Sequence, residues 1–305
     1  MRIAFAGTPD FGALVLGALL RSRHQVAAVF TQPDRPAGRG RRRRQSPVKV
    51  LAEREGIRVE QPERISGQEV VDLLGELEVE VLTVAAYGQI LKAPLLGSLP
   101  CINVHASLLP KYRGASPIER AMMAGEKVTG ISIMEMDAGL DTGDVYLQRP
   151  LQIEDRDDAG GLYEKLGRLG GAALVEVLDA LEDDGFVPRP QHDIGVGYAD
   201  KITRDDMEID WSRHAWEIAA QIRALSPHIG AFTGVEGHRL KVWKAAVAEG
   251  GDGPGTVRVE GERLLVGCGT GSLELLEVQP EGGRRMNASE YLRGHRQTVA
   301  GKRLG

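Results

Sequence analysis

The chain has 305 residues, of which 42% are apolar and 27% charged, so it is long and apolar enough for two domains that each bury a core. The net charge of −5 excludes a protein that is basic over its whole surface. Two segments nevertheless carry local positive charge: residues 34–49 hold seven Arg or Lys against one Asp, and residues 284–305 hold six against one Glu. Such clusters predict local contact with an anionic partner.

No apolar run reaches the roughly 20 residues that cross a bilayer, and the first residues lack the basic start and apolar core of a signal peptide. Cys101 and Cys268 are far apart in apolar surroundings, which is typical of free thiols in a reducing compartment. The seven histidines are scattered and show no zinc-ligand spacing, so no metal is expected. We therefore expect a cytoplasmic monomer without a membrane partner.

Strand-like apolar runs alternate with helix-like amphipathic runs along the first part of the chain. In chain order they are strand-like 2–7, helix-like 11–22, strand-like 25–31, helix-like 47–55, helix-like 67–78, strand-like 79–88, strand-like 101–107, helix-like 116–126 and strand-like 129–136. Ser46 and Pro47 are paired signals for the start of a helix that Gly56 can end. The alternation predicts an α/β domain with a Rossmann-like, mostly parallel sheet.

Ligands of an open parallel sheet bind at the carboxyl ends of its strands, so residues 85–88, 103–107 and 137–144 are expected at that edge. The start GTPDFG is not a dinucleotide-binding loop, because Pro9 stands where close approach to a pyrophosphate requires glycine. NAD binding is therefore excluded. The ligand site of the first domain is expected among the three loops.

A helix-like stretch at 161–181 closes the first domain, which we place at residues 1–186. Prolines and glycines then break the periodicity, and we interpret residues 187–206 as a linker. The remainder, residues 207–305, holds one helix-like segment at 211–225 and short strand-like runs separated by glycines. The strand-like runs are 240–248, 255–260, 262–269 and 272–279. Short strands with glycine-rich turns predict a small β barrel.

Three polar residues could act together on one carbonyl group. In the strand-like CINVH, Asn103 and His105 point to the same face, because side chains two residues apart share a face of a strand. Asp141 lies between Gly139 and Gly143 in a segment that favours a loop able to fold back over that face. Taken alone, each residue also fits an ordinary role: a strand-end amide, a packed histidine and a turn-forming carboxylate.

The flanking sequence favours the catalytic role. The segments NVHASLLPKYRG at 103–114 and MDAGLDTGD at 136–144 resemble the formyltransferase family that takes its one-carbon unit from 10-formyltetrahydrofolate. The likeness runs from IAFAGTPDFG near the start to KVWKA near residue 243, as in members that formylate the methionine of initiator tRNA. The resemblance implies that Asn103, His105 and Asp141 are catalytic and that the second domain is an OB-like barrel that binds tRNA.

The resemblance also implies a folate site. The residues expected to form its wall are Tyr87, Ser107, Leu108, Leu109 and Pro110. Backbone groups near Gly88 and from Asp137 to Leu140 would contact the pterin ring, in keeping with apolar pockets that hold a few placed hydrogen bonds. The expected co-substrate is 10-formyltetrahydrofolate.

The basic segment at residues 34–49 has two interpretations. Its glycines and prolines disfavour regular structure, and a solvated charge run is the simpler interpretation. In the family that the chain resembles, the matching loop enters the acceptor stem of tRNA, where arginines contact phosphates. The resemblance therefore implies initiator methionyl-tRNA as partner. The candidate tRNA-binding residues are Arg39, Arg41, Arg42, Arg43, Arg44 and Lys49.

Formyl transfer needs a stabilised oxyanion and a path for protons from the amine to the departing folate nitrogen. Asn103 can donate to the oxyanion, while His105 and Asp141 can move and orient the proton. Whether His105, Asp141 or a bound water is the final base stays open. The expected function is formylation of methionine on initiator methionyl-tRNA for translation initiation. The alternatives are formyl transfer to a small amine such as an amino sugar or a purine precursor, hydrolysis of the donor, or a tRNA-binding module without catalysis.

Overall fold

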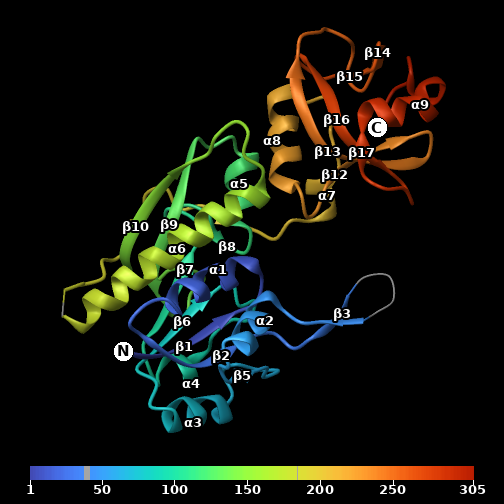
Figure 1. The fold of residues 1–305 in the computed structure, drawn as a ribbon. Helices are drawn as coiled ribbons and strands as arrows, with labels where there is room; N and C mark the ends of the chain where they lie inside the picture. The colour runs from blue at the N-terminus through green and yellow to red at the C-terminus, as the bar shows by residue number, and fades with distance from the viewer. Residues whose placement is uncertain (38–41, 184) are drawn as a thin grey trace. The chain divides into compact units, whose positions relative to one another are not determined.

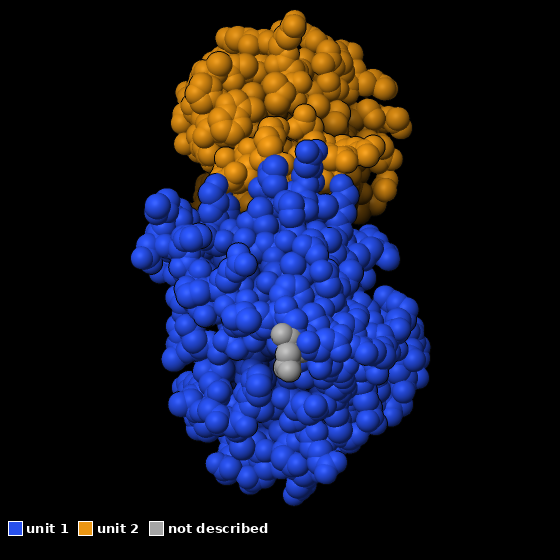
Figure 2. Space-filling model, turned by 90° about the vertical axis from the view of Figure 1, so that its left-hand side faces the viewer, with its two compact units in different colours: residues 1–117, 128–152, 163–199 blue, residues 118–127, 153–162, 200–305 orange. Residues whose placement is uncertain are grey.

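The computed structural model describes residues 1–37, 42–183 and 185–305 (Figure 1). Contacts divide the chain into two compact units, which Figure 2 colours separately. Unit 1 comprises residues 1–117, 128–152 and 163–199, and unit 2 comprises residues 118–127, 153–162 and 200–305. The last division falls within the segment expected as the linker, and the domain limits expected from the sequence stay a prediction.

The described residues of unit 1 form a seven-stranded sheet with the order β10-β9-β7-β6-β1-β2-β5. The parallel strands are β1 (Arg2–Gly7), β2 (Gln25–Phe30), β5 (Val59–Glu60), β6 (Val81–Ala85) and β7 (Cys101–His105). β9 (Val128–Glu135) is antiparallel to β7, and β10 (Val145–Gln152) is antiparallel to β9. The predicted α/β class with a parallel-dominated sheet is confirmed.

Helices connect the strands, as the alternating pattern predicts. Their bounds are α1 (Asp10–Leu19), α2 (Pro47–Arg54), α3 (Gln68–Glu76), α4 (Ala93–Leu96), α5 (Pro117–Met123) and α6 (Ala159–Glu182). The start of α2 agrees with its sequence signals, because Ser46 Oγ accepts a hydrogen bond from Lys49 N at 3.0 Å and Pro47 opens the helix. Among the described residues, no helix is both long and apolar enough to cross a membrane.

The two faces of β7 have different neighbours. This difference determines on which face of the sheet the candidate site lies. Gly170 lets α6 approach the strand closely: a Cβ at this position would lie 2.7 Å from Val104 Cγ1. Val104 therefore points toward α6. Because side chains alternate along a strand, Asn103 and His105 point to the opposite face. The packing of α6 thus decides which side of the sheet carries the polar residues.

The direction of β9 corrects one expectation. Residues 137–144 were expected at the edge where the parallel strands end. Because β9 is antiparallel to β7, it ends beside the start of β7, where Met136 N donates to Cys101 O at 2.8 Å. The loop then folds over the face so that Asp141 lies beside His105, and it ends where Asp144 O accepts a hydrogen bond from Glu135 N at 2.8 Å. The loop folds back over that face, but it arrives from the opposite end.

The basic segment 34–49 is more regular than the expected loop. β3 (Arg35–Ala37) pairs antiparallel with β4 (Arg42–Arg44), and Arg35 lies opposite Arg44. Such a ribbon requires only backbone hydrogen bonds, which charged side chains do not prevent. At its base, Thr31 Oγ1 lies 2.7 Å from Ser46 Oγ. We call β3 and β4 the basic ribbon.

The C-terminal part of unit 2 forms an antiparallel sheet with the order β12-β13-β16-β15-β14, and β17 pairs with β16. The bounds are β12 (Ala231–Val235), β13 (His238–Ala248), β14 (Val257–Glu260), β15 (Arg263–Gly267), β16 (Ser272–Pro280) and β17 (Met286–Asn287). Val257 N donates to Lys302 O at 2.8 Å, and Gly305 N donates to Gly234 O at 3.3 Å. The last residues therefore link the two outer strands, as in a small barrel. The predicted separate C-terminal sheet is confirmed.

Three helices accompany this sheet: α7 (Arg204–Met207), α8 (Ala215–Leu225) and α9 (Ala288–Val299). The sequence pattern predicts α8 but not α9. The arginines of α9 make its apolar pattern hard to recognise in the sequence. In the structure, Tyr291, Leu292 and Val299 form a short apolar face that is buried in the core of the unit. This face holds α9 against the sheet, so part of the basic C-terminal segment has a structural role.

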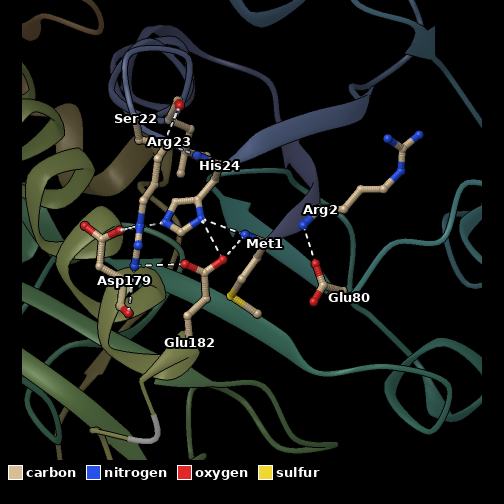
Figure 3. A network of polar contacts seen from close by, with 9 residues as sticks. Met1, Arg2, Ser22, Arg23, His24, Glu80, Asp179 and Glu182 are labelled. Atoms are coloured by element: carbon tan, nitrogen blue, oxygen red, sulfur yellow. Dashed lines mark hydrogen bonds and ion pairs between the residues drawn. The ribbon is translucent and has the colours of Figure 1, made fainter.

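Figure 3 shows a polar cluster next to the start of β2. The buried ring of His24 lies 3.2 Å from the amine of Met1 through Nδ1 and 3.3 Å from Asp179 Oδ1 through Nε2. Arg23 contacts both carboxylates, at 2.5 Å from Asp179 and 2.8 Å from Glu182. His24, Asp179 and Glu182 lie close enough to hold a metal ion, but Arg23 already neutralises the acids. The expectation of no metal stays a prediction.

We expect protonation of His24 to destabilise the folded protein. Burial, helped by the charge of the nearby amine, lowers the pKa of His24 below its ordinary 6.5, so the unfolded chain binds the proton first as the pH falls. The stability that neutral His24 contributes is therefore complete above about pH 6.5 and is lost progressively below it. The melting temperature of the wild type should fall between about pH 7.5 and 5.5, and His24→Gln should make this fall shallower.

Thermal unfolding followed by circular dichroism at several pH values measures the effect. His192→Gln changes an exposed histidine and serves as the control, which should keep the wild-type slope. An unchanged slope in His24→Gln would contradict the prediction.

Candidate active site

Strand β7 places Asn103 and His105 at the centre of the candidate site. On one side β6 sets Val84 opposite Asn103, and on the other β9 sets Ser132 opposite His105. A strand that is paired on both sides holds its side chains in fixed directions. Asn103 is 9% exposed and His105 is 5% exposed, so both are largely shielded from bulk water.

The imidazole of His105 contacts two polar groups. Its Nε2 lies 2.8 Å from the backbone carbonyl of Tyr112. A carbonyl oxygen only accepts hydrogen bonds, so Nε2 carries the proton and donates it. Nδ1 faces Asp141 Oδ2 at 3.6 Å, too far for a direct hydrogen bond but close enough for electrostatic coupling. In the neutral ring, Nδ1 is therefore the nitrogen that can accept a proton.

Asp141 adopts an unusual backbone conformation that its neighbours support. Its φ is +52°, in the left-handed region that non-glycine residues seldom adopt. Its carboxylate Oδ2 accepts a hydrogen bond from Gly114 N at 2.8 Å. Its carbonyl accepts one from Gln191 Nε2 at 2.9 Å, and the same nitrogen donates to Gly143 O at 2.8 Å. Both the backbone and the side chain of Asp141 are therefore anchored beside His105.

The amide of Asn103 is uncommitted by comparison. Within the described ranges, the side chain of Asn103 has no hydrogen-bond partner in the protein, and its amide atoms are not completely sealed from solvent. A shielded donor of this kind gains free energy when a ligand oxygen accepts its hydrogen bond. Asn103 can therefore bind an oxygen on the same face as His105.

Ser132 of β9 anchors the loop that follows β7. Its Oγ donates to Ser107 O at 2.7 Å and accepts a hydrogen bond from Leu109 N at 3.0 Å. Gln148 of β10 donates to Leu109 O at 2.8 Å and to Ser132 Oγ at 2.9 Å. Strands β9 and β10 therefore set the course of this loop.

Three of the eight residues predicted to bind folate have buried side chains: Tyr87, Ser107 and Leu109. Ser107 Oγ donates to Lys111 O at 2.6 Å, inside its own loop. Tyr87 packs into the apolar core around Phe30, and burial raises its pKa to about 12. Because these side chains support the loops from within, their contact with folate stays a prediction.

The other five reach the surface at least in part: Gly88, Leu108, Pro110, Asp137 and Leu140. The carboxylate of Asp137 accepts hydrogen bonds from Gly139 N at 3.0 Å and Thr142 Oγ1 at 2.8 Å, so it shapes the loop that carries Asp141. Leu140 is 52% exposed next to Asp141. An exposed apolar side chain beside a shielded polar cluster is typical of the rim of a ligand site.

The six residues predicted to bind tRNA are placed unequally. Arg39 and Arg41 lie outside the described residues, and Arg42 and Arg43 are described only as backbone of β4. Arg44 is exposed. Lys49 Nζ donates to Asp34 Oδ2 at 2.7 Å and to Gln61 Oε1 at 2.8 Å, so its charge is used at the base of the basic ribbon. The role of these residues toward tRNA stays a prediction.

The second basic cluster, residues 284–305, makes contacts within unit 2. The guanidinium of Arg285 lies 3.7 Å over the ring of Trp243, and its Nε lies 3.3 Å from Glu277. Lys302 Nζ lies 3.0 Å from Glu236. These contacts serve the unit itself, so the extension of a tRNA-binding surface to this cluster stays a prediction.

Three polar residues support the site without any sequence motif: Ser132, Gln148 and Gln191. Ser132 interrupts the apolar run of a buried strand, and this interruption is the one signal that sequence reasoning could have used. Gln148 lies on the partly exposed strand β10, where a polar residue is ordinary. Gln191 lies in the proline-containing segment expected as a linker. Its role depends on a tertiary contact 50 residues away.

Comparisons with known proteins give matches along the whole chain. A family model described as "Formyl transferase" matches residues 1–178, and one described as "Formyl transferase, C-terminal domain" matches residues 201–296. A methionyl-tRNA formyltransferase from Chromobacterium violaceum is 45% identical and covers 100% of both chains. Another from Caldanaerobacter subterraneus subsp. tengcongensis is 48% identical over 97% of both chains.

Solved structures show the same fold at lower identity. A variant of HypX from Aquifex aeolicus has a TM-score of 0.69 at 16% identity, covering 99% of this chain and 49% of that chain. An N-formyltransferase from Helicobacter canadensis, in complex with folinic acid and dTDP-3-aminofucose, has a TM-score of 0.67 at 18% identity, covering 90% of this chain and 98% of that chain. At these identities the likeness shows the fold alone.

Ser132→Ala should destabilise the protein more than a matched change on the same strand. Loss of Oγ removes one partner each from the Ser107 carbonyl and the Leu109 N–H, at a cost of about 1–3 kcal/mol in the free energy of unfolding. Thr129→Val is the control, because Thr129 is 3% exposed and its Oγ1 has no partner in the described part of the chain. Urea denaturation measures both. Equal losses would contradict the anchoring role of Ser132.

Proposed function

This chain belongs to the formyl transferase family, and we propose that it transfers a formyl group from 10-formyltetrahydrofolate to the amino group of methionine on initiator methionyl-tRNA. Full-length similarity to methionyl-tRNA formyltransferases supports this acceptor. The observation that carries the proposal is the arrangement of Asn103, His105 and Asp141 over one face of the sheet. An amide donor, an imidazole acceptor and a carboxylate are the groups that formyl transfer needs.

In the proposed reaction, Asn103 Nδ2 donates a hydrogen bond to the formyl oxygen. Attack of the methionine amine on the formyl carbon forms the new C–N bond and places negative charge on that oxygen. Because Asn103 lies on a strand paired on both sides, its donor keeps its position as the charge develops. One such donor contributes about 3–4 kcal/mol to lowering the barrier. Collapse of the tetrahedral intermediate then breaks the bond between the formyl carbon and N10 of the folate.

His105 Nδ1 takes the proton that the attacking amine loses. Nε2 stays bonded to the carbonyl of Tyr112, which leaves Nδ1 as the accepting nitrogen. Asp141, 3.6 Å away, stabilises the imidazolium that forms. The proton then passes to N10 as the folate leaves, and the ring returns to its neutral form. Asp141 acts as the electrostatic partner of His105 rather than as the final base.

We place the folate against residues 107–110 and the loop that carries Leu140. Leu140 and Ile90 are apolar side chains that are more than half exposed, which suits contact with a flat ring system. Backbone groups near Gly88 and at 137–140 supply polar contacts to the pterin. The exposed apolar side chains, and the loop after β7 that Ser132 and Gln148 hold by hydrogen bonds, support this placement.

We assign tRNA binding to the basic ribbon of the first domain, residues 1–186, and to a C-terminal domain, residues 207–305. Residues 187–206 are the linker between these two domains. The ribbon follows the end of β2, which is the same edge of the parallel sheet at which β7 ends. Arginines at this edge can bind phosphates of the acceptor stem while the end of the tRNA that carries methionine reaches His105. All three proposed catalytic residues come from one chain, so a monomer would suffice for the reaction. Translation initiation, the step that this function serves, would place the protein in the cytoplasm.

Asn103→Ala, His105→Ala and Asp141→Asn should each slow single-turnover transfer to methionyl initiator tRNA by about 100-fold or more, because each removes a group used in the transition state. The exposed histidine variant His192→Ala is the control and should keep the wild-type rate. Near-normal rates in two of the three variants would contradict the catalytic assignment. Wild-type transfer to a small amine or to water, without transfer to tRNA, would contradict the acceptor.

Replacement of Arg41, Arg42, Arg43 and Arg44 together by Gln should raise the KM for tRNA and leave the KM for the folate unchanged. The slope of log KM against log salt should also decrease, by roughly 0.7–0.9 for each phosphate that the variant no longer neutralises. Arg156→Gln with Arg168→Gln, two exposed arginines elsewhere, should change neither quantity. An unaltered KM for tRNA in the fourfold variant would assign the basic ribbon another role.

A further inference from the structure

Gln191 connects the loop of Asp141 to a buried arginine. Its Nε2 donates to Asp141 O at 2.9 Å and to Gly143 O at 2.8 Å. Its Oε1 accepts from Arg113 Nε at 3.1 Å and Arg113 Nη2 at 2.7 Å. We infer that Gln191 is a positioning residue for formyl transfer, which acts by holding Asp141 against His105. This inference rests on the proposed function.

The side-chain amide of Gln191 uses its full hydrogen-bonding capacity. Both N–H groups donate to carbonyl oxygens, and the oxygen accepts twice from one guanidinium. A carboxylate in the same place could not donate to the carbonyls of Asp141 and Gly143, and an alanine could form none of the four hydrogen bonds. The site therefore requires an amide, and Gln191→Glu is a substitution of nearly equal volume that keeps the acceptor for Arg113, removes both donors and adds a negative charge.

The backbone around Gln191 is fixed to the same loop. Val145 N donates to Arg189 O at 2.8 Å, and Arg189 N donates to Val145 O at 3.0 Å. Farther along, β11 (Tyr198–Ala199) pairs with β8 (Arg113–Gly114). The segment between them is thus tied at one end to the start of β10 and at the other to the strand that contains Arg113. The backbone on both sides of Gln191 is therefore fixed by contacts other than the one with Asp141.

Asp141 needs this support because its own backbone does not favour the observed position. A φ of +52° costs free energy for a residue with a Cβ, and it persists only where surrounding contacts maintain it. Gln191 Nε2 holds the backbone carbonyl of Asp141 by a hydrogen bond, and Gly114 N holds its carboxylate in the same way. Without Gln191 the backbone can relax, which moves Oδ2 away from its place 3.6 Å from His105 Nδ1. Displacements of about 1 Å in such sites lower rates by about 100-fold.

The test compares Gln191→Glu and Gln191→Ala with the wild type in single-turnover formyl transfer at saturating tRNA and folate donor. Gln191→Glu should slow the transfer by about 10- to 100-fold, while the KM values for tRNA and folate stay within about twofold. Gln68→Glu, an exposed glutamine on α3, is the matched control and should keep the wild-type rate. A wild-type rate in Gln191→Glu would overturn the inference.

A double-mutant cycle distinguishes positioning of Asp141 from a general loss of structure. If Gln191 acts through Asp141, Gln191→Glu should slow the residual transfer of Asp141→Asn by less than about threefold, because the group that it positions no longer contributes. The same fold loss in both backgrounds would show that Gln191 acts independently of Asp141, and it would overturn the inference. Gln191→Glu is the variant used in the cycle, so failure of Gln191→Ala to fold does not affect the result.

The proposed function is tested separately by the wild type. If the wild-type protein formylates methionyl-tRNA, the ratio of the wild-type rate to the Gln191→Glu rate, measured with and without Asp141→Asn, tests the role of Gln191 alone. If it transfers formyl to a small amine instead, the proposed acceptor is wrong, and the same ratios are measured on that amine. A large ratio there would still support positioning of Asp141 by Gln191, and a ratio near one would overturn it.

Discussion

The alternation of side chains along β7 is the constraint on which the rest of the site depends. Val104 packs against Gly170 of α6, so Asn103 and His105 must face the other side of the sheet. A slip of one residue would exchange these two sets and turn the polar pair toward the helix. Pairing with β6 on one side and β9 on the other opposes such a slip. The apolar packing of α6 thereby determines which face of the sheet carries the proposed catalytic residues Asn103 and His105.

The antiparallel direction of β9 brings distant parts of the chain to that face. The loop after β7 begins at the carboxyl end of that strand, whereas residues 136–144 begin and end beside the start of β7 and fold over the face, where Asp141 lies next to His105. The carboxylate of Asp141 therefore does not belong to the strand that carries His105, and it is held by a network that includes Gly114 and Gln191. The site thus combines a strand that is paired on both sides with a loop residue, Asp141, in a left-handed conformation.

Local patterns predict most of the fold and part of the site. The start of α2 follows from the chemistry of Ser46 and Pro47, and the shared face of Asn103 and His105 follows from strand periodicity. Tertiary contacts decide the remainder. The direction of β9, the apolar face of α9 and the backbone pairing of the basic ribbon depend on neighbours that no local window contains. The contacts of Gln191 span 50 residues to Asp141, so its sequence surroundings give no sign of them.

The contact between Thr31 and Ser46 ties the end of β2 to the first turn of α2. Because Ser46 also caps the helix, the chain is fixed on both sides of the basic ribbon. Where the two ends of a connection are held together, each doubling of its length costs only about 0.6 kcal/mol more. The segment can therefore lengthen or shorten, and change its reach and charge, with little effect on stability. The contact proposed for this segment with tRNA can in this way change while the sheet that carries Asn103 and His105 stays the same.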